Sequence, residues 1–153
     1  MTEKDVCEQF LQGVKDAKME LPYIRNRITA LRQRCRNARA EDTNAVEAYR
    51  RSLREEENRM LQLEQKLLEA EKKVERFIER IPDAESRSIL RFRYIEGLPW
   101  DEVGERIYRS RSRVYAYYKD VTAPLVYKAW EEYEKTDDKH QQKIPGHSDP
   151  HSV

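Results

Sequence analysis

Apolar residues recur at alternating spacings of three and four through the first half of the chain, and this pattern constrains the fold more than any other feature. Such spacing lays one apolar stripe along a helix that pairs with another helix. The first run of the stripe comprises Cys7, Phe10, Val14, Ala17, Leu21, Ile24, Ile28, Leu31, Cys35 and Ala38. The second comprises Val46, Tyr49, Leu53, Glu56, Met60, Leu63, Leu67, Ala70, Val74, Phe77 and Ile81.

The short polar segment RAEDTN separates the two runs. Because short connections make neighbouring helices antiparallel, residues 1–81 are predicted to form a long helical hairpin with coiled-coil character. Arginines in the first run and glutamates in the second suit ion pairs along its flanks. Pro22 predicts either a kink or the start of a second helix. The hairpin is also a candidate for homodimerisation, and closure within one chain or between two is left open.

Charged residues make up 39% of the chain, yet the formal net charge is only +1. An apolar content of 38% is too lean for a large core, and four glycines leave few turns for a β-rich fold. The predicted class is therefore all-α. Any affinity for nucleic acid has to come from local segregation of charge. No apolar run approaches the roughly 20 residues that span a bilayer, so we expect a soluble cytoplasmic protein without a membrane partner.

Side chains that catalyse reactions or hold metals are sparse. Cys7 and Cys35 have no histidine nearby in the sequence and are expected to be small apolar core residues. His140, His147 and His151 lie within residues 135–153, whose composition predicts a disordered tail. Without a phosphate-binding loop or a catalytic set, the sequence predicts no enzyme, no metal site and no cofactor.

Residues 82–134 are predicted to form a small bundle of short helices. Asp83 is a candidate N-cap, Gly97 a stop signal, and Pro99 a first helical residue. Ser110 caps the next helix after the turn Tyr-Arg-Ser, which gives the dimensions of a helix-turn-helix. Gly104 lies where the two helices cross, although glycine costs a helix interior up to about 1 kcal/mol, so we expect a packing reason for it.

The helix after this turn, about residues 111–122, separates apolar from basic positions. With Val114 and Tyr118 facing inward, the opposite face carries Arg111, Ser112, Arg113, Tyr115, Ala116 and Lys119. In a DNA major groove these basic side chains would neutralise phosphates or donate to guanine, and Ser110 at the helix start would also donate to phosphate. The alternative is a positively charged helix of a three-helix bundle with no ligand.

The stretch SILRFRYIEGLPWDEVGERIYRSRSRVYAYYKD resembles the fourth conserved region of bacterial sigma factors. More narrowly, RYIEGLPWDEV behind a long helical hairpin is similar to the small ArpU-like transcriptional regulators of phages and prophages. The resemblance implies binding of double-stranded DNA and control of transcription in a bacterial host cell, with RNA polymerase as a further partner. Three positions depart from the pattern: Pro99 replaces a capping Ser or Thr, Tyr108 a turn glycine, and Arg109 an apolar core residue.

Carried over by position, the resemblance makes two groups of residues candidates for DNA contact. Arg91 and Arg93 occupy basic positions in the first helix of the small domain, where contacts to the DNA backbone are expected. The recognition helix contributes Arg111, Ser112, Arg113, Tyr115, Ala116 and Lys119, and Ser110 joins them because it lies at the helix N-terminus, which donates to phosphate. Two other classes of protein remain as alternatives: a coiled-coil structural or interaction protein, and a DNA-packaging protein like the terminase small subunit.

Overall fold

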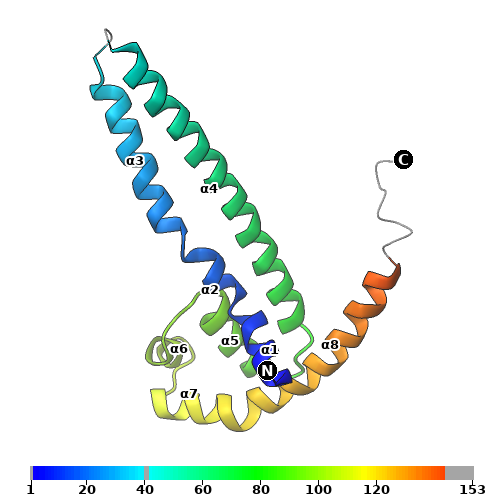
Figure 1. The fold of residues 1–153 in the computed structure, drawn as a ribbon. Helices are drawn as coiled ribbons and strands as arrows, with labels where there is room; N and C mark the ends of the chain where they lie inside the picture. Colours follow the sequence, from blue (N-terminus) through cyan, green and yellow to red (C-terminus); the bar gives the residue numbers. More distant parts are fainter. Residues whose placement is uncertain (1, 40–41, 144–153) are drawn as a thin grey trace. The chain divides into compact units, whose positions relative to one another are not determined.

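The structure, a computed structural model, describes residues 2–39 and 42–143, with side chains through Lys135. These residues are helical with no strand, which confirms the all-α class (Figure 1). In chain order the elements are α1 (Glu3–Leu11), α2 (Gly13–Lys18), α3 (Leu21–Asn37), α4 (Thr43–Ile78), α5 (Ala84–Leu90), the π-helical segment η1 (Arg91–Ile95), α6 (Trp100–Arg106), α7 (Arg111–Tyr117), the π-helical segment η2 (Tyr118–Thr122) and α8 (Ala123–Lys143). None of the helices in the described ranges is long and apolar enough to cross a membrane.

The chain divides into two compact units, and one of them contains both ends of the chain. The terminal unit comprises Met1–Leu11 and Val74–Val153, and the middle unit comprises Gln12–Lys73. This division differs from the predicted domains 1–81 and 82–134, because α1 and the end of α4 contribute side chains to the same core as α8.

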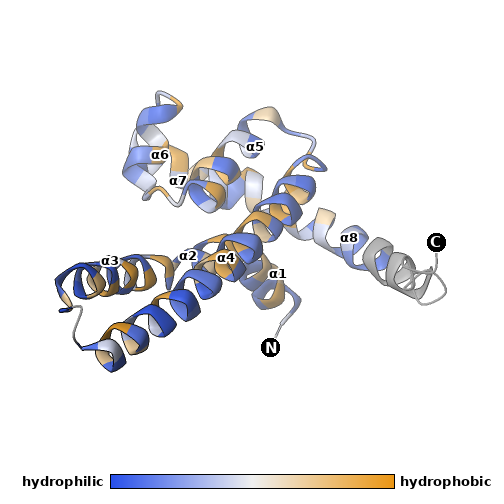
Figure 2. Cartoon of the chain, turned by 90° about the horizontal axis from the view of Figure 1, so that it is seen from above, coloured by the Kyte–Doolittle hydropathy of each residue, from blue (hydrophilic) through white to orange (hydrophobic). Residues whose placement is uncertain are grey.

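The middle unit is built on α3 and α4, which lie side by side and run in opposite directions (Figure 1). Ion pairs join Arg27 to Glu56 at 3.4 Å and Arg32 to Glu57 at 3.0 Å. Hydrophilic and hydrophobic residues alternate along both helices, as expected of helices that bury one side (Figure 2). The four buried residues of α3 all belong to the predicted stripe: Leu21, Ile24, Ile28 and Leu31.

The first run of the stripe is not one helix, because the helix is interrupted after Leu11 and again after Lys18. The second break precedes Pro22, which occupies the first turn of α3. A proline is tolerated there because the first turn leaves its N–H groups unbonded in any case. Pro22 therefore starts a helix, which was one of its two predicted roles.

The core of the terminal unit contains an aromatic cluster from three helices. Phe10 of α1 packs against Phe77 of α4 at 5.7 Å between ring centroids, and against Trp130 of α8 at 5.0 Å. Tyr133 lies 5.4 Å from Phe77. Cys7, also on α1, is fully buried, and burial raises the pKa of its thiol to about 12, as expected of an apolar core residue.

A second, smaller core joins α5, α6 and α7 through Ile89, Val103 and Val114, which are fully buried. Local signals set the ends of these helices. Asp83 accepts a hydrogen bond from the Ser86 backbone N–H at 3.1 Å, and Gly97 ends the first segment at φ +74°. Both agree with the prediction, whereas Pro99 is the N-cap of α6 and not its first helical residue.

The last helix, α8, begins after a π-helical turn and continues into the predicted tail. At its start, the Ala123 N–H bonds to the Tyr118 carbonyl five residues back, so a π-helical turn precedes Pro124, which has no N–H. At its end, α8 continues to Lys143, beyond Lys135, where no structure was expected. Residues 144–153, with His147 and His151, and the side chain of His140 lie outside the described part of the chain.

Candidate nucleic-acid interface

Gly104 allows α7 to begin directly against α6. A Cβ atom at this position would lie 2.5 Å from the backbone oxygen of Arg109. The Arg109 N–H donates to the Gly104 carbonyl at 2.8 Å, which closes the turn between the helices. The close approach expected at Gly104 is therefore present, and it involves the backbone of the turn.

Tyr108 and Arg109 shape this turn. Tyr108 has φ +60° and is 96% exposed, so it adopts the left-handed conformation, which glycine adopts more readily. Arg109 does not fill the core. Its guanidinium bonds through two nitrogens to the Glu85 carboxylate and lies 5.4 Å from the Tyr117 ring centroid. The side chain of Arg109 therefore ties the turn to α5.

The outer face of α7 carries the predicted polar positions. Ser110 caps the helix, since its Oγ accepts from the Arg113 N–H at 3.3 Å. Val114 is fully buried and Tyr118 is partly buried against the small core, as predicted. The exposed residues of this stretch are Ser110, Arg111, Ser112, Arg113, Tyr115, Ala116, Lys119 and Asp120.

A chain of hydrogen bonds holds the inner side of α7 to α5. The Tyr117 hydroxyl donates to Asp83 at 2.5 Å, and the Ser86 hydroxyl donates to the same carboxylate oxygen at 2.7 Å. These bonds hold the pKa of Asp83 below its usual value and raise the pKa of Tyr117 to about 12. Ser86 also contacts the Thr122 hydroxyl at 2.7 Å inside the core.

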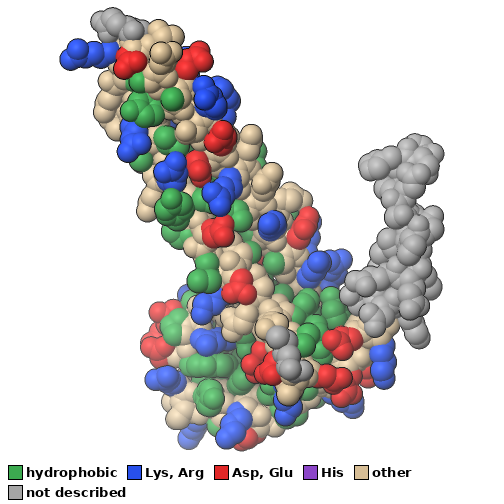
Figure 3. All heavy atoms as spheres, in the orientation of Figure 1, with side chains coloured by type: hydrophobic (Ala, Val, Ile, Leu, Met, Phe, Trp, Pro, Cys, Tyr) green, Lys and Arg blue, Asp and Glu red, His purple; other side chains and the backbone are tan. Residues whose placement is uncertain are grey.

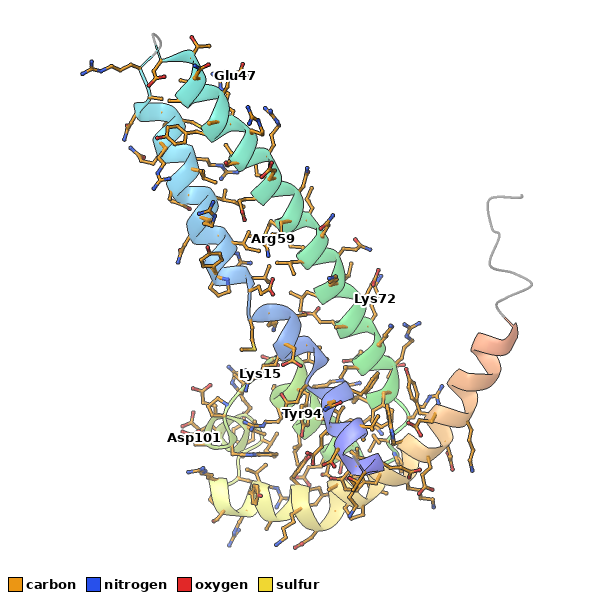
Figure 4. The ribbon with its side chains drawn as sticks, viewed as in Figure 1. Lys15, Glu47, Arg59, Lys72, Tyr94 and Asp101 are labelled. Carbon is orange, nitrogen blue, oxygen red and sulfur yellow. The ribbon has the colours of Figure 1, made fainter. Side chains whose placement is uncertain are left out.

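The two π-helical segments meet through tyrosines. The Tyr94 hydroxyl of η1, labelled in Figure 4, lies 2.9 Å from the Tyr118 hydroxyl of η2. Burial is the largest cause that raises the pKa of each phenol, so both tyrosines stay protonated and neutral. Sequence reasoning identified neither the Tyr94–Tyr118 pair nor the bond from Tyr117 to Asp83, because residues 24 and 34 positions apart leave no local signal.

An open depression of about 690 Å³ adjoins the outer face of α7. Trp100, Ser110, Arg111, Ser112 and Tyr115 line it. The Trp100 ring stands edge-to-face with Tyr115 at 5.5 Å between centroids. Trp100 was not among the predicted site residues, and its only sequence signal was an aromatic at the start of a short helix.

A protein family described as "Protein of unknown function (DUF1492)" matches residues 49–125, which are 77 of the chain's 153 residues. The chain belongs to the DUF1492 family. No curated protein and no solved structure matches it. The DUF1492 segment includes most of α4 and all of α5, α6, α7 and the depression, so the geometry described above belongs to the family's matched region.

Two predicted site residues of this DUF1492 protein have intramolecular partners. Arg91 donates to Glu75 of α4 at 2.7 Å. Arg93 donates to the Leu98 carbonyl at 3.1 Å, and its guanidinium lies 4.8 Å from the Trp100 ring centroid. Both arginines are half-buried, whereas Arg111 and Arg113 of α7 are exposed.

Charge in the DUF1492 segment changes sign across the turn. Asp101, Glu102 and Glu105 are exposed on α6, whereas Arg111 and Arg113 are exposed on α7. Figure 3 shows basic side chains at the lower edge of the view, where α7 lies in Figure 1. Among the described residues, no three His, Cys, Asp or Glu side chains are grouped so that they could hold a metal ion. The arrangement offers cationic donors, hydroxyls and aromatic rings, which suit an anionic partner with flat faces.

Proposed function

We propose that this DUF1492 protein binds duplex DNA through α7 and regulates transcription in a phage or prophage. The observation that supports DNA binding is the exposed face of α7 and η2. Arg111 and Arg113 of α7 and Lys119 of η2 are exposed there, and the sequence has no acid between Arg106 and Lys119. Phosphate contacts by such cations supply most of the affinity of a DNA-binding protein. Hydroxyls and an aromatic ring on the same face add groups that contact bases.

In this proposal α6, the turn and α7 act as a helix-turn-helix, with α7 in the major groove. The hairpin of α3 and α4 has coiled-coil character and is a candidate dimer contact. The role in transcription, RNA polymerase as a partner and the bacterial cytoplasm as the location rest on the resemblance to sigma region 4 and to ArpU-like regulators.

The experiment is a mobility-shift titration of the full chain with duplex DNA at several salt concentrations. We expect affinity to fall steeply with salt, because each neutralised phosphate releases counterions. The double variant Arg111→Ala/Arg113→Ala should bind at least about tenfold more weakly. The negative slope of log K against log salt should become shallower by about 2, because two phosphate contacts are lost.

A matched control removes two positive charges elsewhere. Arg50 and Arg51 are exposed on α4, so Arg50→Ala/Arg51→Ala changes the net charge equally while leaving α7 intact. Equal weakening by the two double variants would mean that binding depends on total charge, and the proposal for α7 would be wrong. Absence of binding at low salt would also contradict it.

Paired α3 and α4 favour a second candidate function, a coiled-coil structural or interaction protein. A DNA-packaging role like that of the terminase small subunit is the other alternative. Chromatin immunoprecipitation from phage-infected cells separates them: a transcription regulator enriches promoters, a packaging protein enriches packaging sites, and a structural protein enriches no DNA.

A further inference from the structure

The depression beside α7 combines two kinds of surface. The rings of Trp100 and Tyr115 form apolar walls, whereas Arg111 and Ser112 supply a guanidinium and a hydroxyl. Ser110 adds a second hydroxyl, which lies 3.3 Å from that of Ser112. A group that fits here has an apolar part next to a hydrogen-bond acceptor.

Trp100 is held in place by residues of η1 and η2. Its ring centroid lies 4.8 Å from that of Tyr118, whose hydroxyl bonds to Tyr94. The Arg93 guanidinium lies 4.8 Å from the centroid of the same ring. The wall formed by Trp100 is therefore set before any ligand binds, whereas Tyr115 is 49% exposed and faces the solvent.

Among the base edges in the major groove, only that of thymine has an apolar group next to a hydrogen-bond acceptor. Thymine presents its C5-methyl group next to the O4 acceptor, guanine presents two acceptors without a methyl group, and cytosine presents a donor. A bare phosphate would match the donors but would leave the aromatic walls without an apolar partner. Adenine places a donor beside its acceptor, which opposes the Arg111 donors.

We propose that the depression reads a thymine, with its methyl group against Trp100 and Tyr115 and its O4 accepting from Arg111 or Ser112. This inference rests on the proposed binding of α7 in the major groove and adds a specificity determinant to it. Trp100 and Tyr115 act as specificity residues, while Arg113 and Lys119 contribute affinity for any sequence.

The test uses the full chain and the duplex that it enriches from a random DNA pool. Each thymine of that site is replaced singly by deoxyuridine, which removes the methyl group and keeps O4. At one thymine per bound α7, we expect binding to weaken about fourfold, the factor for burying one methyl group. The Tyr115→Ala and Trp100→Ala variants should lose this thymine-to-uracil ratio.

The ratio is informative even where a variant is less stable, because both duplexes meet the same protein sample. Trp100 packs against the small core, so Tyr115→Ala, at an exposed position, is the decisive variant. Lys119→Ala is the matched control, and it should weaken binding to both duplexes while keeping the ratio near four.

Three results would overturn the inference. They are an enriched site without thymine, a ratio near one at every thymine, and a fourfold ratio that survives in Tyr115→Ala. In each case the protein still binds DNA, so the proposed function stands. If the chain binds no duplex, the proposed function fails and this inference fails with it.

Discussion

Two residues with unusual backbone requirements set the turn before α7. Gly104 has no space for a Cβ atom, because the Arg109 carbonyl oxygen occupies it, and Tyr108 adopts positive φ while almost fully exposed. The geometry of the outer face of α7 therefore depends on one missing methyl group and one left-handed residue.

Gly104→Ala should lower the free energy of unfolding by about 1–3 kcal/mol, the usual cost of forcing extra atoms into a packed site. Urea unfolding followed by circular dichroism measures it. Gly13→Ala is the matched control, since no atom lies within 4 Å of a Cβ there and alanine favours helix. Its stability should stay equal or rise by up to about 1 kcal/mol, and equal losses in both variants would refute the packing explanation.

Residue signals that act over a few positions could be predicted from the sequence. Asp83 and Ser110 cap helices, Gly97 takes positive φ, and Gly104 marks a close approach, because each role depends on neighbours in the chain. The intramolecular contacts of Arg91, Arg93 and Arg109 could not be predicted. Their partners Glu75, Trp100 and Glu85 come together only in the folded unit.

At the scale of elements, α4 carries a polar residue in its apolar stripe. The side chain of Glu56 is 12% exposed, and its Oε1 faces Arg27 while its Oε2 is buried without a partner among the described residues. A buried carboxylate with one oxygen unpaired lowers the free energy of unfolding relative to an apolar residue of similar size at the same position. Without Glu56, the apolar stripe of α4 would stabilise the protein more.

Glu56→Leu should therefore raise the free energy of unfolding by about 1 kcal/mol or more. Arg27 stays solvated after the change, because it is 44% exposed. Glu57→Leu is the comparison: the Glu57 side chain is 40% exposed and pairs with Arg32 at the surface, so little change is expected. Thermal unfolding of both variants gives the difference, and a loss of stability in Glu56→Leu would show that the carboxylate is stabilising.

The spacing of apolar residues predicted which sides of the helices are buried, but not where the helices break. The spacing of the apolar stripe does not change across Gln12 and Met19. Nevertheless, α1 ends just before Gln12 and α2 ends just before Met19. The π-helical segments were also missed. Their i to i+5 bonds accompany the Tyr94–Tyr118 contact, which a periodicity cannot reveal.

At the scale of the whole molecule, the N-terminal helix belongs to the unit that carries the candidate interface. Tyr127 of α8 donates to Glu8 of α1 at 3.2 Å, and Phe10 contacts three aromatic rings in the same core. A fragment that begins near Ile81 would lack Phe10 and Phe77. Binding studies should therefore use the full chain.

Phe10→Ala should lower the free energy of unfolding of the terminal unit by about 2–4 kcal/mol, somewhat less than for a fully buried phenylalanine. Urea unfolding followed by near-ultraviolet circular dichroism, which is sensitive to the environment of Trp130, measures this free energy. Tyr23→Ala, at a ring that is 62% exposed on α3, should change stability by less than about 0.5 kcal/mol. A Phe10→Ala protein as stable as the wild type would mean that α1 is dispensable for this core.

The bond between Glu8 and Tyr127 joins residues 119 positions apart, which has a consequence for synthesis. At 5–20 residues per second, a ribosome needs roughly 6–24 s between the two. During that time Phe10 lacks Trp130 and Tyr133 of α8, two of the three rings that it contacts. The aromatic core of the terminal unit can therefore be completed only after α8 has been translated.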